Sequence, residues 1–389
     1  MRTAEIPRSS PVVVVGGGII GLALAFELGR RGTPVLVLER DRVGAGAANV
    51  AAGMLAAAGE AEHETPELVE LMVESLRSYP AFVRDVEQSS GVACGLREEG
   101  TLIVALGRDD EEELLHLRRA QDRLGLASRW LSGDEARSLE PHLSPRITAA
   151  LLAEDDHQVD PRALLAALGA AVDALGGRVV EGARVTGFET EGGRLASVVG
   201  IRDREGIPFE VRCEAAVLAA GAWSAADLRW PTDPLPVRPV KGQVVRLRGP
   251  ELLRRVVRGP QVYLVPRRTG ELVVGATMEE VGFDATPTAG AVMDLLWRAR
   301  LLVPAVYDLG LVEVDTGFRP AARDHLPILG ETGVPGLYVA TGHFRHGILL
   351  APVTAALLAD LLVGGRASPL LAPFRPARFA AGAPAEGRA

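Results

Sequence analysis

The chain has little cysteine, a single lysine and few aromatic residues. Of its 389 residues only Cys94 and Cys213 are cysteines, and aromatic residues make up 4%. The two cysteines are far apart and have neither a metal-ligand nor a redox spacing, which is typical of a protein in a reducing cytoplasm. Lys241 is the only lysine, so arginine supplies the other basic side chains. This bias is more typical of nucleotide composition than of a function.

Long apolar runs and an excess of positive charge are also missing. The formal charge is −8, from 42 basic and 50 acidic side chains, which does not favour nucleic-acid binding. The N-terminal apolar run is too short for a signal peptide. The late segment Ile348 to Val363 contains Pro352 and Asp360, so we expect a buried helix rather than a membrane span. With 48% hydrophobic residues, the chain is long and apolar enough for two domains that can interleave.

The most informative segment is a glycine-rich stretch near the N-terminus. Four valines, Val12 to Val15, predict a strand, and the glycines that follow have the GxGxxG spacing. In this pattern Gly16 allows a tight turn, Gly18 lets the backbone approach a pyrophosphate, and Gly21 lets helix and strand pack closely. The N–H groups at the start of the helix can then bind phosphate.

An acidic residue follows the next predicted strand. Val35 to Leu38 is apolar and ends in Glu39, 18 residues after Gly21. A carboxylate there can accept hydrogen bonds from both hydroxyls of an adenosine ribose. It disfavours a 2′-phosphate and therefore NADP, while NAD and FAD both remain open. The small-residue stretch Gly44 to Met54 indicates backbone lying against a flat or bulky group, or an alanine-rich helix, and both can hold.

Periodicity and turn residues predict the remaining elements. We expect helices over 19–31, 67–88, 111–124 and 161–175 and from 348 onward, and Asp160 as an N-cap. We expect strands over 97–104 and 149–152, a meander over 178–180, 184–189 and 197–202, a short strand at 217, and a second, antiparallel sheet over 242–247, 262–266 and 272–277. The segments 315–320 and 337–340 are expected to lead back to the first domain.

Seven motifs occur in an order that resembles one family. They are GGGIIG at Gly16, AAGML at Ala51, PVKGQ at Pro239, YLVPR at Tyr263, VVGATM at Val273, GFRP at Gly317 and GHFRHGI at Gly342. With them the chain resembles the glycine oxidase and D-amino-acid oxidase superfamily of FAD enzymes, and bacterial glycine oxidases most of all. The resemblance implies an α/β fold in which a Rossmann-type FAD-binding domain is interleaved with an antiparallel-sheet substrate domain.

The resemblance also implies domain boundaries and an assembly. The FAD-binding domain would comprise 1–88, 151–234 and 317–374, and the substrate domain 89–150 and 235–316. The tail 375–389 is expected to be disordered. The family implies non-covalent FAD, O₂ as electron acceptor and a homo-oligomer, in the family's case a tetramer. His343 and His346 lack a third ligand, so no metal is expected.

The family pattern assigns roles to five residues in the substrate pocket. Arg319 matches the arginine that binds the substrate carboxylate, a role that suits its planar fork. Tyr263 matches a tyrosine whose hydroxyl bonds the same carboxylate; without the resemblance it would be a core aromatic. Arg345 matches a position that contacts substrate or cofactor. Met278 matches a pocket wall, as does Met54, although either could be core filler.

The glycine turn and the resemblance together predict the cofactor-binding residues. They are Gly16, Gly18, Ile19, Ile20, Gly21, Glu39, Arg40, Ala47, Ala48, Ala52, Gly53, Met54, Val185, Gly221, His343, Phe344, Arg345, His346, Gly347, Ile348 and Leu349. His343 is expected to line the flavin through its backbone. The helix after GHFRHGI would point its N-terminus at the pyrimidine end of the flavin, where its partial positive charge favours the reduced ring.

The function implied is oxidation of glycine and of small D- or N-methyl amino acids, with H₂O₂ as product and thiamine thiazole synthesis as a possible use of the imino acid. One alternative is a D-amino-acid dehydrogenase with a non-oxygen acceptor. Another, which rests on Gly16 to Glu39 alone, is an NAD-binding dehydrogenase or dinucleotide-sensing module.

Gln261 and His346 depart from the family pattern, where we expect histidine and asparagine. A flavin-linking cysteine and the lysine of sarcosine oxidases are absent, which disfavours covalent FAD.

Overall fold

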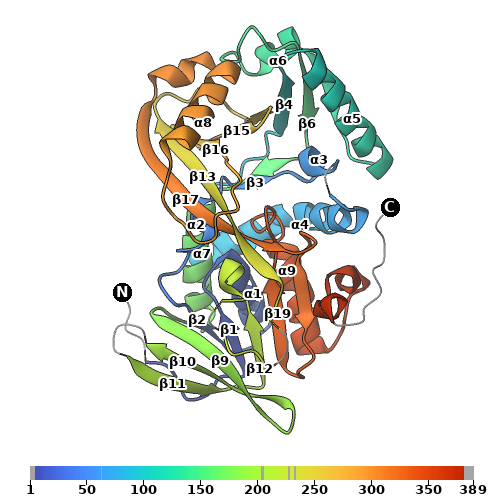
Figure 1. Cartoon of the computed structure of the whole chain (residues 1–389). Helices are drawn as coiled ribbons and strands as arrows, with labels where there is room; N and C mark the ends of the chain where they lie inside the picture. Colours follow the sequence, from blue (N-terminus) through green and yellow to red (C-terminus); the bar gives the residue numbers. More distant parts are fainter. Residues whose placement is uncertain (1–4, 63, 203–205, 227, 232–233, 381–389) are drawn as a thin grey trace.

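Two large sheets organise the chain in the computed structural model, which describes residues 5–62, 64–202, 206–226, 228–231 and 234–380 (Figure 1). The six-stranded sheet has the order β18-β19-β12-β1-β2-β8. Its strands are β1 (Val12–Val15), β2 (Val35–Leu38), β8 (Arg178–Val180), β12 (Ala215–Leu218), β18 (Ile328–Glu331) and β19 (Leu337–Thr341). All pairs are parallel except that of the edge strand β18. Strands from three distant parts of the sequence therefore build one sheet.

The central strands of this sheet are buried on both faces. Val12 and Val14 of β1 pack in a core with the helices, and Val13 and Val15 pack in a core with a three-stranded sheet. The helices are α1 (Ile19–Arg30), α4 (Pro66–Ser90), α7 (Pro161–Ala174) and α9 (Ala351–Gly364), and the three strands are β9 (Ala183–Glu191), β10 (Arg194–Arg202) and β11 (Ile207–Arg212). This two-sided burial explains why β1 and β2 are runs of aliphatic residues rather than alternating ones.

The eight-stranded sheet has the order β17-β13-β16-β15-β14-β4-β6-β5. Its strands are β4 (Thr101–Ala105), β5 (Arg129–Ser132), β6 (Ala149–Ala153), β13 (Val237–Arg248), β14 (Val256–Gly259), β15 (Val262–Pro266), β16 (Glu271–Gly275) and β17 (Gly310–Ala322). Helices α5 (Arg108–Leu124), α6 (Gly133–Leu139) and α8 (Ala289–Leu302) lie at its end of the molecule (Figure 1). All strand pairs are antiparallel except β4 with β14. The predicted fold class is confirmed; the domain boundaries stay a prediction.

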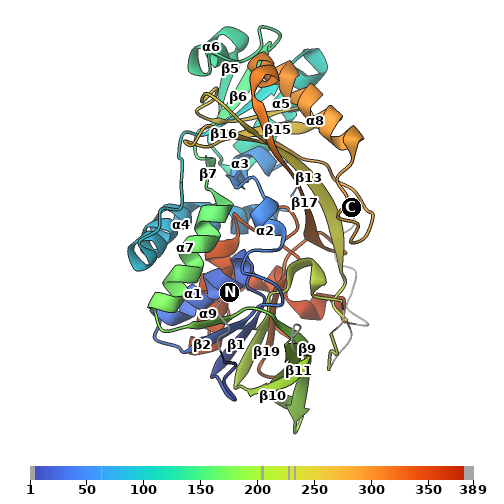
Figure 2. The same ribbon diagram turned by 90° about the vertical axis from the view of Figure 1, so that its left-hand side faces the viewer.

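The longest strands, β13 and β17, run from the eight-stranded sheet toward the six-stranded sheet in both views (Figures 1 and 2). They pair from Val237 with Ala322 to Arg248 with Gly310. Lys241 on β13 is 1% exposed and donates a hydrogen bond of 2.6 Å to the carbonyl of Thr286. Three short elements lie between the sheets: α2 (Ala47–Val50), β3 (Met54–Leu55), which pairs with β7 (His157–Gln158), and α3 (Ala57–Glu60).

Several expectations hold and three need correction. Asp160 caps α7 as predicted, with its carboxylate accepting from the N–H groups of Arg162 and Ala163. Residues 178–180 are not part of the meander, because β8 pairs with β2, and the meander consists of β9 to β11. The last long helix starts at Ala351, since 347–350 form a turn before it.

The predicted disordered tail is wrong for its first part. The segment Pro376–Phe379 forms a 3₁₀ turn, and Arg378 donates to Asp324 at 2.8 Å. The remainder of the tail, 381–389, lies outside the described residues. No single described helix is long and apolar enough to cross a membrane. The segments Ala351–Gly364 and Pro369–Phe379 would together be long and apolar enough, but they are bent by 103° relative to each other.

Candidate functional site

A large cavity lies between the two sheets and contains about 1860 Å³ of empty space, its open mouth included. Its walls come from β1, β2, β19 and the segment after β12 on one side and from β13, β15 and β17 on the other. The lining includes the glycine turn with Glu39, the residues 45–48 and 50–54, and the side chains of Tyr263, Arg319 and Arg345. The motifs that the sequence separates by hundreds of residues therefore share one cavity.

The glycine turn leaves backbone N–H groups at the cavity wall. Gly16 has φ +115°, and a Cβ atom there would be 2.5 Å from the carbonyl oxygen of Ala219. A Cβ atom on Gly21 would be 2.0 Å from the carbonyl oxygen of Gly16, so the strand and α1 can pack this closely only without a side chain. Gly18 is the N-cap of α1, has no atom within 4 Å of its Cβ position, and provides no capping side chain. The start of α1 is thus open to a phosphate group.

The carboxylate of Glu39 is held by its own backbone surroundings. It accepts a hydrogen bond from the N–H of Gly17 at 2.7 Å and from the N–H of Asp41 at 2.8 Å. Burial raises the pKa of Glu39, and the two N–H groups oppose that shift. The guanidinium of Arg40 lies 4.7 Å above the ring of Trp223, and both residues line the cavity. Glu39 is therefore a fixed acceptor at the end of β2, as a ribose site requires.

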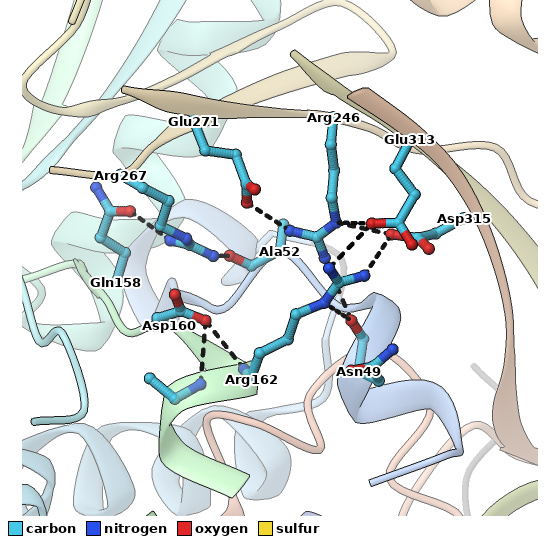
Figure 3. Close-up of polar contacts among 11 residues, drawn as sticks. Asn49, Ala52, Gln158, Asp160, Arg162, Arg246, Arg267, Glu271, Glu313 and Asp315 are labelled. Carbon is cyan, nitrogen blue, oxygen red and sulfur yellow. Dashed lines mark hydrogen bonds and ion pairs between the residues drawn. The ribbon is translucent and has the colours of Figure 1, made fainter. Parts of the chain in front are cut away.

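Three arginines bind backbone carbonyl oxygens of the cavity-lining segment around α2 (Figure 3). Arg162 and Arg246 donate to the carbonyl of Asn49 at 2.9 and 3.2 Å. Arg267 donates to the carbonyl of Ala52, and burial lowers the pKa of Arg267 to about 10. Four of the six residues from Ala47 to Ala52 are alanines, so these contacts to carbonyl oxygens replace packing that larger side chains would give.

Acidic residues of the eight-stranded sheet balance this positive charge (Figure 3). Arg246 is buried and pairs with Asp315 at 2.7 Å and with Glu271 at 2.8 Å. Arg162, on α7, pairs with Asp315 at 2.8 Å and with Glu313 at 3.0 Å. The network thereby ties α7 and the cavity-lining segment to β13, β16 and β17. A buried charged network of this kind needs all its partners, because an unpaired charge is costly there.

Arg319 on β17 presents a guanidinium without an acidic partner. Its Nη1 atom donates to the carbonyl oxygens of Thr277 and Lys241, at 3.0 and 3.3 Å. No carboxylate of the described residues forms an ion pair with it. Gly242 on the neighbouring strand makes room, since a Cβ atom there would be 2.4 Å from Nη1. Burial lowers the pKa of Arg319, so a bound anion would relieve an unfavourable environment.

Tyr263 on β15 lies beside Arg319 at the cavity wall. A Cβ atom on Gly275, across the strand pair, would be 2.5 Å from the Tyr263 hydroxyl. Burial raises the pKa of Tyr263, and the nearby Arg319 opposes the shift. The hydroxyl thus stays protonated near neutral pH and can donate a hydrogen bond to the group that Arg319 binds.

Arg345 lines the same cavity but is paired with an acid. It forms an ion pair with Glu60, which also pairs with Arg258 at 2.9 Å. Burial alone would raise the pKa of Glu60, but Arg258 and Arg345 outweigh it and lower that pKa. Next to them Asp156 accepts from the N–H groups of Ala58 and Gly59, both at 2.9 Å, and burial raises its pKa to about 7.

Most predicted site residues line the cavity. They are Gly16, Gly18, Ile19, Ile20, Glu39, Arg40, Ala47, Ala48, Ala52, Gly53, Met54, Val185, Gly221, Tyr263, Arg319, His343, Phe344, Arg345, Gly347 and Ile348. His343 is buried, its Nε2 atom lies 3.1 Å from the hydroxyl of Thr354, and burial lowers its pKa to about 3. Whether each of these residues contacts cofactor or substrate stays a prediction.

The structure places four predicted residues away from the cavity wall. Gly21 packs under the turn. The Leu349 side chain is in the helix core, and His346 turns its Nε2 atom to Glu64 at 2.8 Å. Met278 is 65% exposed and does not line the cavity, so it is not a wall residue here. It lies at the surface between Thr277 and Glu279. The Thr277 hydroxyl donates to the Glu279 carboxylate, and both side chains accept a hydrogen bond from Gln243.

Sequence reasoning missed Glu60, Arg258 and Asp156. No motif marks them, and Arg258 is one arginine among many. Glu60 had one usable signal: it is the first charged residue after the run of small and apolar residues that begins at Val43. No group of three or more His, Cys, Asp or Glu side chains in the described part of the chain could hold a metal ion.

A family model described as FAD dependent oxidoreductase matches residues 11–361. The chain belongs to this family. FAD is therefore its cofactor, which decides between the NAD and FAD that Glu39 left open. The cavity suits this cofactor, because it joins a phosphate-accepting helix start to a wall of alanines and glycines that lets a flat ring lie close to the backbone.

The chain is 39% identical over 374 residues to the bifunctional protein ThiO/ThiG of Trichormus variabilis, covering 95% of this chain and 55% of that protein. It thus spans about half the length of the bifunctional relatives. It is 36% identical to the glycine oxidase of Geobacillus kaustophilus, covering 93% of this chain and 95% of the relative. The crystal structure of glycine oxidase from Geobacillus kaustophilus superposes with a TM-score of 0.87 at 34% identity, covering 96% of this chain and 100% of that one.

Proposed function

We propose that the protein oxidises glycine and other small amino acids, with O₂ as the final acceptor and H₂O₂ as a product. The observation that carries this proposal is the unpaired guanidinium of Arg319 beside the hydroxyl of Tyr263, in the same cavity as the dinucleotide cradle. The similarity to glycine oxidases supports the same reaction.

Bound FAD supplies a hydride acceptor and returns the electrons to O₂. The protein's own part is to bind and orient the substrate. Arg319 would bind the substrate carboxylate with its planar fork, and Tyr263 would donate its hydroxyl hydrogen to the same group. The amino acid loses a hydride from Cα and a proton from its amine, and the resulting imine hydrolyses to a keto acid and ammonia. Orientation of this kind can supply much of the rate enhancement without a general base.

The proposal includes three further expectations. FAD is bound without a covalent link, because Cys94 and Cys213 do not line the cavity. The imino acid from glycine serves thiamine thiazole synthesis, in line with the ThiO/ThiG relatives. A cytoplasmic location and a homo-oligomer remain predictions that rest on the sequence resemblance.

A substrate panel under air with peroxide detection tests the proposal. One carboxylate clamp and one direction of hydride departure leave a single direction for the side chain. Glycine, sarcosine and D-alanine should therefore give peroxide, L-alanine should give none, and D-phenylalanine should be poorer than glycine. Strong activity on L-alanine, or a preference for D-phenylalanine over glycine, would overturn the proposal. Dye reduction without peroxide would favour the dehydrogenase alternative.

A further inference from the structure

The two arginines at the substrate end of the cavity are in different electrostatic states. Arg319 bonds to two backbone carbonyl oxygens, which are neutral acceptors. Arg345 is paired with the carboxylate of Glu60. A substrate carboxylate can therefore bind Arg319 without displacing another anion. To bind Arg345, it has to compete with an acid that is already in place.

Glu60 is fixed in its position by more than Arg345. Its side chain is 6% exposed, and it pairs on its other side with Arg258 at 2.9 Å. Arg258 in turn donates to the carbonyl of Gly59 at 2.8 Å, which holds the guanidinium beside α3. A buried carboxylate between two guanidinium groups is costly to displace, because its departure would leave both guanidinium groups without their acidic partner.

The two arginines act on the same small region of the cavity. Both Arg319 and Arg345 lower the pKa of Tyr263, which burial raises, and Glu60 acts on the same hydroxyl in the opposite sense. Both arginines and the tyrosine line the cavity. A substrate held by Arg319 would therefore carry any second acidic group into the neighbourhood of Arg345 and Glu60.

We propose that Glu60 is a specificity-determining residue that restricts the site to substrates with one carboxylate, by occupying the guanidinium of Arg345 and repelling a second acid. This inference rests on the proposed function. If Glu60 is neutralised, Arg345 becomes a second carboxylate receptor. The site should then accept iminodiacetate, whose oxidation with O₂ and water gives glyoxylate, glycine and H₂O₂.

The test compares Glu60→Gln with Glu64→Gln as purified FAD-loaded proteins. Glu64 is a half-buried acid four residues further along the chain, but it pairs with His346 rather than with Arg345. Acetate and malonate are titrated separately, and binding is followed by the visible absorbance of the flavin. Glu60→Gln should shift the ratio of the two Kd values toward malonate by about tenfold or more, as expected for a new charge-assisted contact, and Glu64→Gln should not. The ratio of peroxide formed from iminodiacetate and from glycine should change in the same direction.

Further variants keep the test decisive if Glu60→Gln folds poorly. The pair Glu60→Gln with Arg258→Gln removes one charge of each sign and should show the same malonate preference. The pair Glu60→Gln with Arg345→Gln should lose it. Arg345→Gln alone should leave the malonate-to-acetate ratio as it is in the unchanged protein, because Glu60 already occupies that arginine. A changed ratio of the malonate and acetate Kd values in Arg345→Gln alone, or an unaltered ratio in a folded Glu60→Gln, would overturn the inference.

The titration does not depend on turnover, so the two proposals fail separately. Absence of peroxide from glycine with the unchanged protein rejects the proposed oxidase function, while the binding ratios remain measurable. Normal glycine oxidation together with an unaltered ratio in Glu60→Gln rejects only the role of Glu60.

Discussion

The two ends of the cavity present different kinds of groups. At the nucleotide end most of them are backbone: the turn at Gly16, the open N-terminus of α1, and Gly17, whose N–H holds the carboxylate of Glu39. At the proposed substrate end they are side chains on separate strands, Arg319 and Tyr263. Recognition by backbone depends on the local backbone conformation, which leaves little room for added side-chain atoms. Recognition by side chains depends on which residues the fold brings together.

The difference teaches what each end can tolerate. A methyl group added at Gly16 or Gly21 meets a backbone carbonyl oxygen that cannot move aside, so the whole turn is disrupted. A changed side chain at the substrate end alters one contact and leaves the cradle in place. Cofactor binding and substrate binding should therefore respond to different substitutions.

The largest effect is expected from Gly21→Ala. The new Cβ atom would be 2.0 Å from the carbonyl oxygen of Gly16, so strand and helix must separate. We expect a loss of about 3 kcal/mol or more of folding stability, and a protein that no longer retains FAD. Thermal unfolding and the flavin content after gel filtration measure both.

Gly169→Ala is the matched control for this change. Gly169 lies inside α7, and the nearest atom to its Cβ position is 4.0 Å away. The same chemical change should there stabilise the helix by roughly 0.5–1 kcal/mol and leave flavin content unaltered. A Gly21→Ala protein that keeps its flavin and its stability would contradict the backbone role of the turn.

A narrower effect, confined to the substrate, is expected from Arg319→Ala. Removing the carboxylate anchor should cost on the order of 2–5 kcal/mol, about 30- to several thousand-fold in kcat/KM for glycine. FAD content should stay near normal, because Arg319 takes no part in the hydrogen bonds that hold the glycine turn and Glu39. Steady-state kinetics with flavin quantification checks this. Near-normal kcat/KM would show that another residue is the anchor.

The smallest effect is expected from Glu39→Gln. The amide keeps one oxygen acceptor but loses the charge, so we expect FAD to bind about tenfold more weakly. At saturating FAD the kcat/KM for glycine should be unchanged. Fluorescence titration of the apoprotein gives the Kd. If kcat/KM fell while the FAD Kd stayed constant, the two ends of the cavity would not be separable in the way described.

The same contrast explains how much the sequence could predict. The glycine turn, Glu39 and the N-cap Asp160 are local patterns, so their geometry follows from spacing alone, and the structure has them as expected. Tyr263 and Arg319 could be chosen only because a family pattern singled them out. Glu60 and Arg258 are 198 residues apart in the sequence and meet only through the packing of α3 against β14, for which no local pattern exists.

The errors have the same physical origin. Met278 was expected at a wall because it matched a motif, but a motif does not give the exposure of a side chain. The boundary of the last helix was misplaced by three residues, since the turn after His346 is as apolar as the helix itself. In both cases burial by distant parts of the chain decided the outcome.

The burial of Lys241 has a consequence for how the protein can be modified. It is the chain's only lysine, so among the residues described no side-chain amine reaches the surface. Acylating reagents, reducing sugars and amine-directed cross-linkers therefore have no lysine ammonium to attack in the folded protein. Trypsin is confined to arginine on the exterior, and any immobilisation for assay has to use another functional group. An amine count that rises on denaturation would report unfolding of β13 itself.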